Sequence, residues 1–151
     1  MPTLTWSDLF TDDPSLDIGN LLQMWPHTVT GRLRPIGMSA FGDIYFERPD
    51  GHVERLDVLE GGITQIAATR AEFTKLMNTQ TWQEKNLLSE GVALLADRGK
   101  KRQPQQCFAP VPHPALSGSI DWNGIMVMDA AAWHSICSQM LDGFHKDEHA
   151  T

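Results

Sequence analysis

The feature that most constrains the fold is a hairpin pattern in the first half of the chain. Residues Gly42–Glu47 alternate polar and apolar side chains, and Pro49-Asp50-Gly51 supplies residues that favour a reversal of the chain. The run 52–59 returns along this strand, and another short apolar run follows at 63–67. The pattern therefore predicts an antiparallel meander of three or four strands over residues 31–66.

Helical patterns lie on both sides of this predicted sheet in the sequence. A short helix is expected between Asp13, an N-cap residue followed by proline, and Pro26, which ends it. Two capping boxes, at Thr69–Glu72 and Thr81–Glu84, predict two further helices, and Gly99 closes the second of them.

A last helix is predicted to begin after Asp129. Its buried stripe would consist of Trp133, Ile136, Cys137 and Met140, and the apolar run 125–128 before it is expected to be buried as well. Together these patterns predict an α+β fold: a small antiparallel meander packed with about four helices. We expect a single domain over residues 1–144 and a disordered tail at 145–151, because 151 residues is a common length for one domain.

The charge of the chain is acidic and unevenly distributed. Nineteen Asp and Glu stand against twelve Lys and Arg, and four of these cations lie between residues 98 and 102. Residues 1–31 contain four Asp and neither Lys nor Arg. Such a chain repels nucleic acid and favours basic partners, although an acidic surface also serves solubility. We therefore expect no nucleic-acid partner.

The cysteines and the apolar runs indicate a compartment. Cys107 and Cys137 are too few for the disulfide frameworks of small secreted proteins. The first ten residues lack the charged and apolar regions of a secretory signal, and no apolar run reaches the roughly 18 residues that a membrane span needs. The sequence predicts a cytoplasmic protein with free thiols and no membrane association.

Six histidines and two cysteines raise the possibility of a metal site. His134 and Cys137 are spaced to share a helical face, and Cys107 with His113 could complete a set of four ligands. Zinc sites usually contain closely spaced ligand pairs at both ends of the set, and this one does not. Cys137 also belongs to an apolar stripe, where a buried cysteine is common. We expect no metal and no cofactor.

Catalytic patterns are equally weak. There is no Gly-x-Ser-x-Gly elbow and no phosphate-binding glycine loop, and Ser117-Gly118-Ser119 has only the proximity of His113 in its favour. Four acids flank the predicted hairpin and could pair for acid–base chemistry, but they more simply form the solvated side of a sheet; they are Asp43, Glu47, Glu54 and Asp57. The sequence therefore predicts a protein that is not an enzyme and has no catalytic residues.

Two of the five tryptophans do not fit an apolar stripe. Trp82 lies opposite the leucine stripe of its predicted helix, and Trp122 lies in the polar turn Asp121-Trp122-Asn123-Gly124. An exposed tryptophan beside a carboxylate is typical of an interface anchor. The alternative is that each ring covers a small pocket under a loop. Our predicted partner-binding residues are Trp82, Asp121, Trp122, Asp43 and Glu54.

Several short motifs, in the same order, resemble a known family. They are Phe41-Gly42-Asp43-Ile44-Tyr45-Phe46, Gly51-x-Val53-x-x-Leu56-Asp57, the run 63–67, Glu72-Phe73, Gln106-Cys107-Phe108, Pro114–Gly118 and the last helix with Trp133. Over residues 30–141 the chain resembles immunity proteins of bacterial type VI secretion systems, in the DNase-immunity C-terminal domain family. Two departures stand out. Only about thirty residues precede the match, where family members often carry another domain, and Leu116-Ser117-Gly118 replaces an expected Leu-Gly-Gly.

The resemblance implies a non-catalytic α+β domain, a monomer or weak dimer, that binds a co-encoded toxin in the producing cell's cytoplasm. On this hypothesis the chain neutralises a secreted nuclease-type effector by occluding its active site. A regulatory or scaffold interaction domain, of the kind found in cell-wall-assembly regulators, is the first alternative. A small hydrolase using the 113–121 loop is the second.

Overall fold

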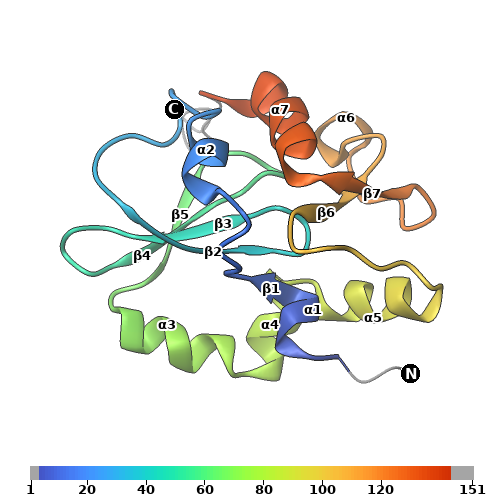
Figure 1. The fold of residues 1–151 in the computed structure, drawn as a ribbon, viewed down its shortest axis with the longest axis horizontal. Coiled ribbons are helices and arrows are strands. Elements are labelled where there is room, and N and C mark those ends of the chain that lie inside the picture. Colours follow the sequence, from blue (N-terminus) through green and yellow to red (C-terminus); the bar gives the residue numbers. More distant parts are fainter. Residues whose placement is uncertain (1–3, 144–151) are drawn as a thin grey trace.

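The computed structural model describes residues 4–143, and these form one α+β domain, as predicted. Five strands make an antiparallel sheet in sequence order (Figure 1). They are β1 (Phe10–Thr11), β2 (Arg34–Ser39), β3 (Ile44–Glu47), β4 (Val53–Leu56) and β5 (Ile63–Ala67). The predicted meander is confirmed as β2–β5. The sequence pattern missed β1, which has only two residues and pairs with the end of β2.

A second, two-stranded sheet consists of β6 (Gln106–Pro110) and β7 (Ile125–Asp129). The amide of Phe108 donates to the carbonyl of Ala40 at 2.8 Å and so connects this sheet to the end of β2. Residues 125–128 were expected to be buried, and this is wrong for Met126, which is 51% exposed. The reason is that the segment is a strand, in which alternate side chains point to opposite faces.

Helices cover both faces of the five-stranded sheet (Figure 1). They are α1 (Trp6–Leu9), α2 (Ile18–Leu22), α3 (Arg70–Met77), α4 (Gln80–Asn86), α5 (Ser89–Asp97), α6 (Pro114–Ser117) and α7 (Ala130–Leu141). α2 and α7 pack with Ile44, Phe46 and Leu56 on one face, and α3, α4 and α5 pack on the other face, which carries Tyr45. The sheet is therefore the middle layer between two hydrophobic clusters.

The register of β3 and β4 determines which side chains share a face. Ile44 lies opposite Leu56, and Tyr45 lies opposite Arg55. Because side chains alternate along a strand, Tyr45 and Arg55 share the face that α3–α5 cover, and the next residues outward on that face are Asp43 and Asp57. The hairpin thus brings two carboxylates to one end of the sheet.

The start of the first predicted helix differs from the prediction. The short N-terminal helix starts after Asp17, whose carboxylate accepts from the amide of Asn20 at 3.1 Å, and not after Asp13. Asp13 instead accepts from the amide of Ser15 at 2.8 Å in a preceding turn. The helix start predicted at Thr69 is confirmed, since the hydroxyl of this N-cap residue accepts from the amide of Glu72 at 3.0 Å.

The helix predicted from Thr81 to Gly99 is broken into α4 and α5. α4 begins after Thr79, and Leu88 at the break has a left-handed φ of 54°. We call residues 86–89 the α4–α5 elbow. The break lets Leu87, Val92 and Leu95 all enter the cluster around Tyr45. Tertiary packing has overridden a continuous helical propensity here.

Two tryptophans, Trp25 and Trp133, are fully buried and hydrogen-bonded in the core. The indole of Trp133 donates to the carbonyl of Phe41 at 2.9 Å, and that of Trp25 donates to Nδ1 of His134 at 3.0 Å. Nε2 of His134 lies 2.8 Å from the carbonyl of Gly42. Ile136, expected in the buried stripe of α7, is 41% exposed, so that prediction is wrong. The tail predicted at 145–151 lies outside the described residues.

Candidate functional site

An open cleft lies where the loop after β4, the α4–α5 elbow and the segment 114–120 meet. It encloses about 450 Å³. Its polar lining consists mainly of Asp43, Asp57, Glu60, Arg55, Lys85 and Asn86, and we call it the acidic cleft. An apolar groove of about 560 Å³, which includes Leu116 and Met140, shares Leu59, Glu60, Pro114 and Gly118 with it.

Backbone contacts hold the two aspartates of the cleft in place. Oδ1 of Asp43 accepts from the amide of Val58 at 2.9 Å, and the amide of Asp43 donates to the hydroxyl of Ser39 at 3.1 Å. Oδ1 of Asp57 accepts from the amides of Leu59 and Glu60 at 2.9 and 2.8 Å. Both carboxylates therefore have fixed positions, determined by the chain that leaves β4.

Asp43 is a buried carboxylate whose pKa is raised. Only 7% of the residue is exposed, and this burial raises its pKa from 3.8 to about 7, with the charge of Asp57 adding to the effect and Arg55 opposing it. Arg55 lies between the sheet and the elbow: it donates to Oδ1 of Asn86 at 2.9 Å and lies 3.9 Å from Asp57. Arg55 thus faces two aspartates at once, and Asp43 carries its full negative charge only above about pH 7.

The hairpin acids do not form one solvated face, and that prediction is wrong. Asp43 is buried, and Glu47 lies 3.7 Å from Arg70 of α3. Glu54 is on the opposite face of β4 from Arg55, since neighbouring residues of a strand alternate. The four acids therefore belong to three different environments, and only Asp43 and Asp57 belong to the cleft.

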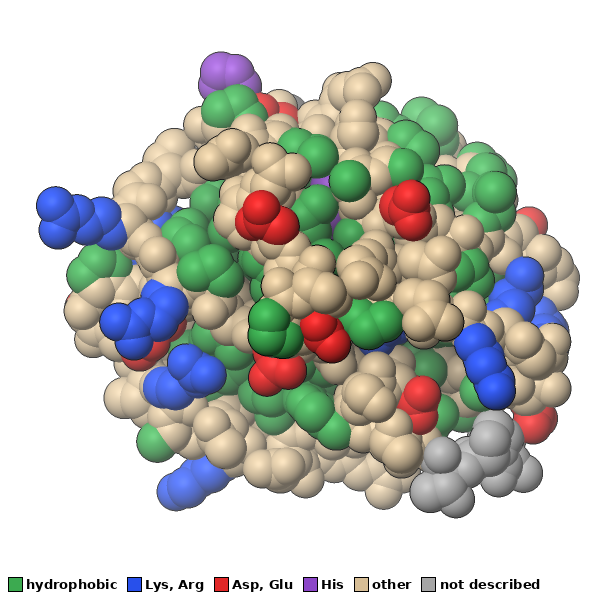
Figure 2. Space-filling model, in the orientation of Figure 1, with side chains coloured by type: hydrophobic (Ala, Val, Ile, Leu, Met, Phe, Trp, Pro, Cys, Tyr) green, Lys and Arg blue, Asp and Glu red, His purple; other side chains and the backbone are tan. Residues whose placement is uncertain are grey.

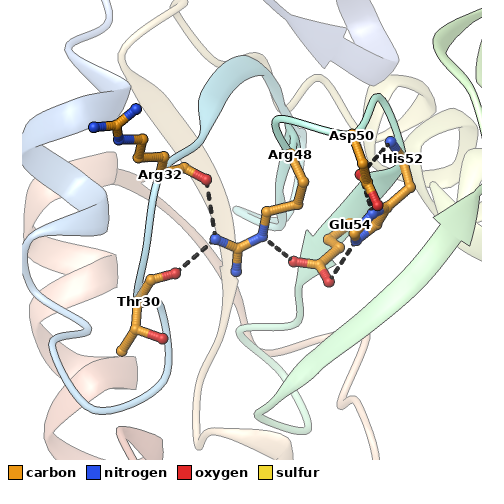
Figure 3. Close-up of polar contacts among 6 residues, drawn as sticks. All are labelled: Thr30, Arg32, Arg48, Asp50, His52 and Glu54. Carbon is orange, nitrogen blue, oxygen red and sulfur yellow. Dashed lines mark hydrogen bonds and ion pairs between the residues drawn. The ribbon is translucent and has the colours of Figure 1, made fainter.

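Glu54 belongs to a separate polar network on the β3–β4 hairpin (Figure 3). Nε of Arg48 donates to it at 2.6 Å and His52 contacts it at 3.0 Å, while another nitrogen of Arg48 donates to the carbonyls of Thr30 and Arg32. Burial would raise the pKa of Glu54, but the bonds from His52 and Arg48 outweigh it and lower that pKa. Arg48 therefore connects the hairpin to residues 30–32, and Glu54 holds the Arg48 guanidinium in place.

The two predicted anchor tryptophans are half-buried and not exposed as expected. The ring of Trp82 lies 6.0 Å from that of Tyr45 and 5.9 Å from that of Phe73. Trp82 would lie opposite the leucine stripe only if one continuous helix ran through residue 88, and the elbow breaks that helix. Trp82 instead packs against the cluster around Tyr45, and a partner-binding role for it stays a prediction.

Trp122 lies against α5. Its ring meets that of Phe41 edge-on at 5.8 Å and covers Gly91, while Arg98 donates to its carbonyl at 2.9 Å. Asp121 is exposed and accepts from the amide of Asn123 at 3.0 Å. Asp121 and Trp122 do not line the acidic cleft, so the structure does not gather the five predicted residues into one site.

His113, which the sequence placed in both the four-ligand metal set and the hydrolase loop, has other partners in the structure. His113 is buried, with Nε2 2.9 Å from the carbonyl of Val58 and Nδ1 accepting from the amide of Ala115. It therefore does not pair with Ser117, whose hydroxyl donates to the carbonyl of Ser119. Within residues 4–143, no three His, Cys, Asp or Glu side chains lie where they could hold a metal ion together. In the same part of the chain, no helix is long and apolar enough to cross a membrane.

Sequence reasoning missed Arg55 and Asn86, and it gave Asp57 no role beyond a solvated face. The turn at residues 49–51 fixes the register of the hairpin, and that register could have indicated that residues 43 and 57 share one face. Asn86 could not have been found in this way, because the elbow that positions it has no clear sequence signal.

Comparison with known proteins gives a likeness of fold. No family model matches the chain, and no curated protein matches it. Among solved structures, the chain is similar to the crystal structure of Atu4351 from Agrobacterium tumefaciens, with a TM-score of 0.63 and 19% sequence identity. The alignment covers 89% of this chain and 68% of that one. At this identity the similarity establishes a shared fold and nothing about activity.

Proposed function

We propose that this chain is an immunity protein, which binds a co-encoded secreted toxin in the cytoplasm and blocks it by covering the toxin's active site. The toxin would be a nuclease-type effector of a type VI secretion system. One observation carries the proposal: three of the seven segments on which the resemblance to such proteins rests, 41–46, 51–57 and 114–118, contribute to the acidic cleft. They supply Asp43, Arg55 with Asp57, and Pro114 with Gly118.

The chemistry of the cleft supports a basic partner. Enzymes that act on nucleic acid attract phosphate with positive surfaces, so their inhibitors benefit from carboxylates. The cleft offers Asp43, Asp57 and Glu60 against Arg55 and Lys85. The adjoining apolar groove, with Leu116 75% exposed at its rim, supplies surface that a partner can bury. Inhibition by occlusion needs no chemistry from the chain itself.

The proposal is tested with the product of the adjacent gene. We expect the two proteins to co-purify, and we expect this chain to restore growth of cells that express the toxin. Glu60→Lys, within the cleft, should weaken binding at least about tenfold. Glu72→Lys, exposed on α3 and outside the cleft, is the matched control and should change affinity less than about twofold. Absence of both binding and rescue by the unchanged protein would refute the proposal.

The association rate should also depend strongly on salt. Between about 10 and 150 mM salt we expect it to fall about tenfold, because exposed charges steer the encounter and salt screens them. Stopped-flow measurements with the purified toxin would record this, and the dissociation rate should change much less. An association rate that is the same at both salt concentrations would remove electrostatic attraction from the proposal.

A further inference from the structure

A second groove lies on the other side of the α4–α5 elbow. It encloses about 710 Å³ between α1, α4 and α5, and its lining includes Trp6, Leu9, Gln83, Glu84, Glu90 and Ala93. We call it the Trp6 groove. Trp6 is 38% exposed, and its ring lies 5.3 Å from that of Phe10, which in turn packs 5.7 Å from Tyr45 in the core. The partly exposed Trp6 ring is therefore held in position by Phe10, which packs in the core.

The charged side chains that line the Trp6 groove are all acidic. Its lining contains Glu84 and Glu90 and no lysine or arginine, and neither glutamate forms an ion pair with another residue in the range 4–143. The Glu84 carboxylate accepts from the side-chain amide of Gln80 at 3.0 Å, and this neutral group does not neutralise its charge. On the face shown in Figure 2, acidic side chains occupy the middle, and lysine and arginine side chains lie toward the margins.

We propose that the Trp6 groove binds a lysine- or arginine-bearing segment of the same partner protein that covers the acidic cleft. The indole ring can pack against the aliphatic stem of such a side chain and attract its cationic group, while the two glutamates neutralise that group. The inference rests on the proposed function for the identity of the partner. It adds a second contact region and states its chemistry.

The position of the elbow makes one partner sufficient for both clefts. Lys85, Asn86 and Leu88 line the acidic cleft, whereas Gln83, Glu84 and Glu90 line the Trp6 groove. The acidic cleft and the Trp6 groove therefore lie on opposite sides of the α4–α5 elbow. A standard protein interface covers roughly 800 Å² on each partner, which is wide enough to span the elbow.

The test uses the full chain and the product of the adjacent gene, with affinity measured by calorimetry. Glu84→Lys combined with Glu90→Lys should weaken binding at least about thirtyfold. The control combines Asp12→Lys with Glu72→Lys, which changes the net charge equally at two exposed positions outside the groove. It should weaken binding less than about threefold, and thermal melting should show that both variants are folded.

Trp6 provides an independent variant. Trp6→Ala should weaken binding about tenfold, and Trp6→Phe should restore most of this loss, because phenylalanine keeps an aromatic wall. If the unchanged protein binds and the groove variants bind as well as the charge-matched control, the Trp6 groove is not a contact region, while the proposed function stands. If the unchanged protein does not bind the adjacent product at all, both proposals fail.

Discussion

Asp43→Asn should make the protein more stable at pH 8, with a smaller gain near pH 5 and none below the unfolded pKa of 3.8. Burial raises the pKa of Asp43 from 3.8 to about 7, so between these values the folded protein keeps a proton that the unfolded chain has lost. The wild-type protein therefore loses stability as the pH rises through this interval. Asparagine stays neutral and can still accept from the amide of Val58. We expect a gain of about 1–4 kcal/mol in the free energy of unfolding at pH 8.

Urea denaturation at several pH values between 5 and 8 measures this effect. The charged groups facing Asp43 are Asp57, Glu60 and Arg55, and they stay the same in the variant. Asp43→Ala is the second variant: it also loses the acceptor for Val58, so it should be less stable than Asn at every pH yet show the same flattened dependence. If the wild-type and Asn curves run parallel from pH 5 to 8, Asp43 does not titrate in this range.

Gly91→Ala should destabilise the fold by about 2–3 kcal/mol, against the usual helix preference for alanine. A Cβ at this position would overlap the ring of Trp122, which lies directly over Gly91. The ring would have to leave its place beside Phe41, and the contact that holds the 121–124 turn against α5 would be lost. Thermal or urea denaturation at a fixed pH measures the change.

Gly19→Ala is the matched control, because Gly19 is also in the first turn of a helix. A Cβ there meets only a carboxylate oxygen of Asp17, at an ordinary 3.6 Å. We expect it to be neutral or to stabilise the protein by about 0.5 kcal/mol. If both substitutions have the same small effect, Trp122 does not lie on α5 as described.

The parts of the fold that the sequence predicted are those with strong local signals. The alternation at residues 42–47 and the turn at 49–51 predicted the meander, and Thr69 predicted the start of α3, because each depends on neighbouring residues. The two-residue strand β1 is too short to show alternation. The elbow at Leu88 depends on packing of α5 against the sheet, which no local pattern encodes.

The site was predicted less well than the fold. Asp43 was named, but as an exposed acid, because a strand pattern alone does not reveal whether α4, α5 and the 114–120 segment close over one end of the sheet. Trp82 and Trp122 were placed on the surface from helical angle and polar neighbours, whereas long-range ring contacts with Tyr45 and Phe41 partly bury them. Trp6 was not singled out, because the groove that it lines is completed by α4 and α5, which lie far from it in the sequence.

His134, which lies behind the acidic cleft, and Asp43, which lines the cleft, change charge in different pH ranges. The Trp25 indole donates to Nδ1, so the neutral ring carries its proton on Nε2, which reaches the carbonyl of Gly42 beside Asp43. Burial lowers the pKa of His134 to about 4, whereas Asp43 titrates near 7. Over the pH range in which Asp43 changes charge, the His134 ring stays neutral and keeps the same tautomer. A change in the protonation of Asp43 therefore leaves the charge and the hydrogen bonds of His134 unchanged.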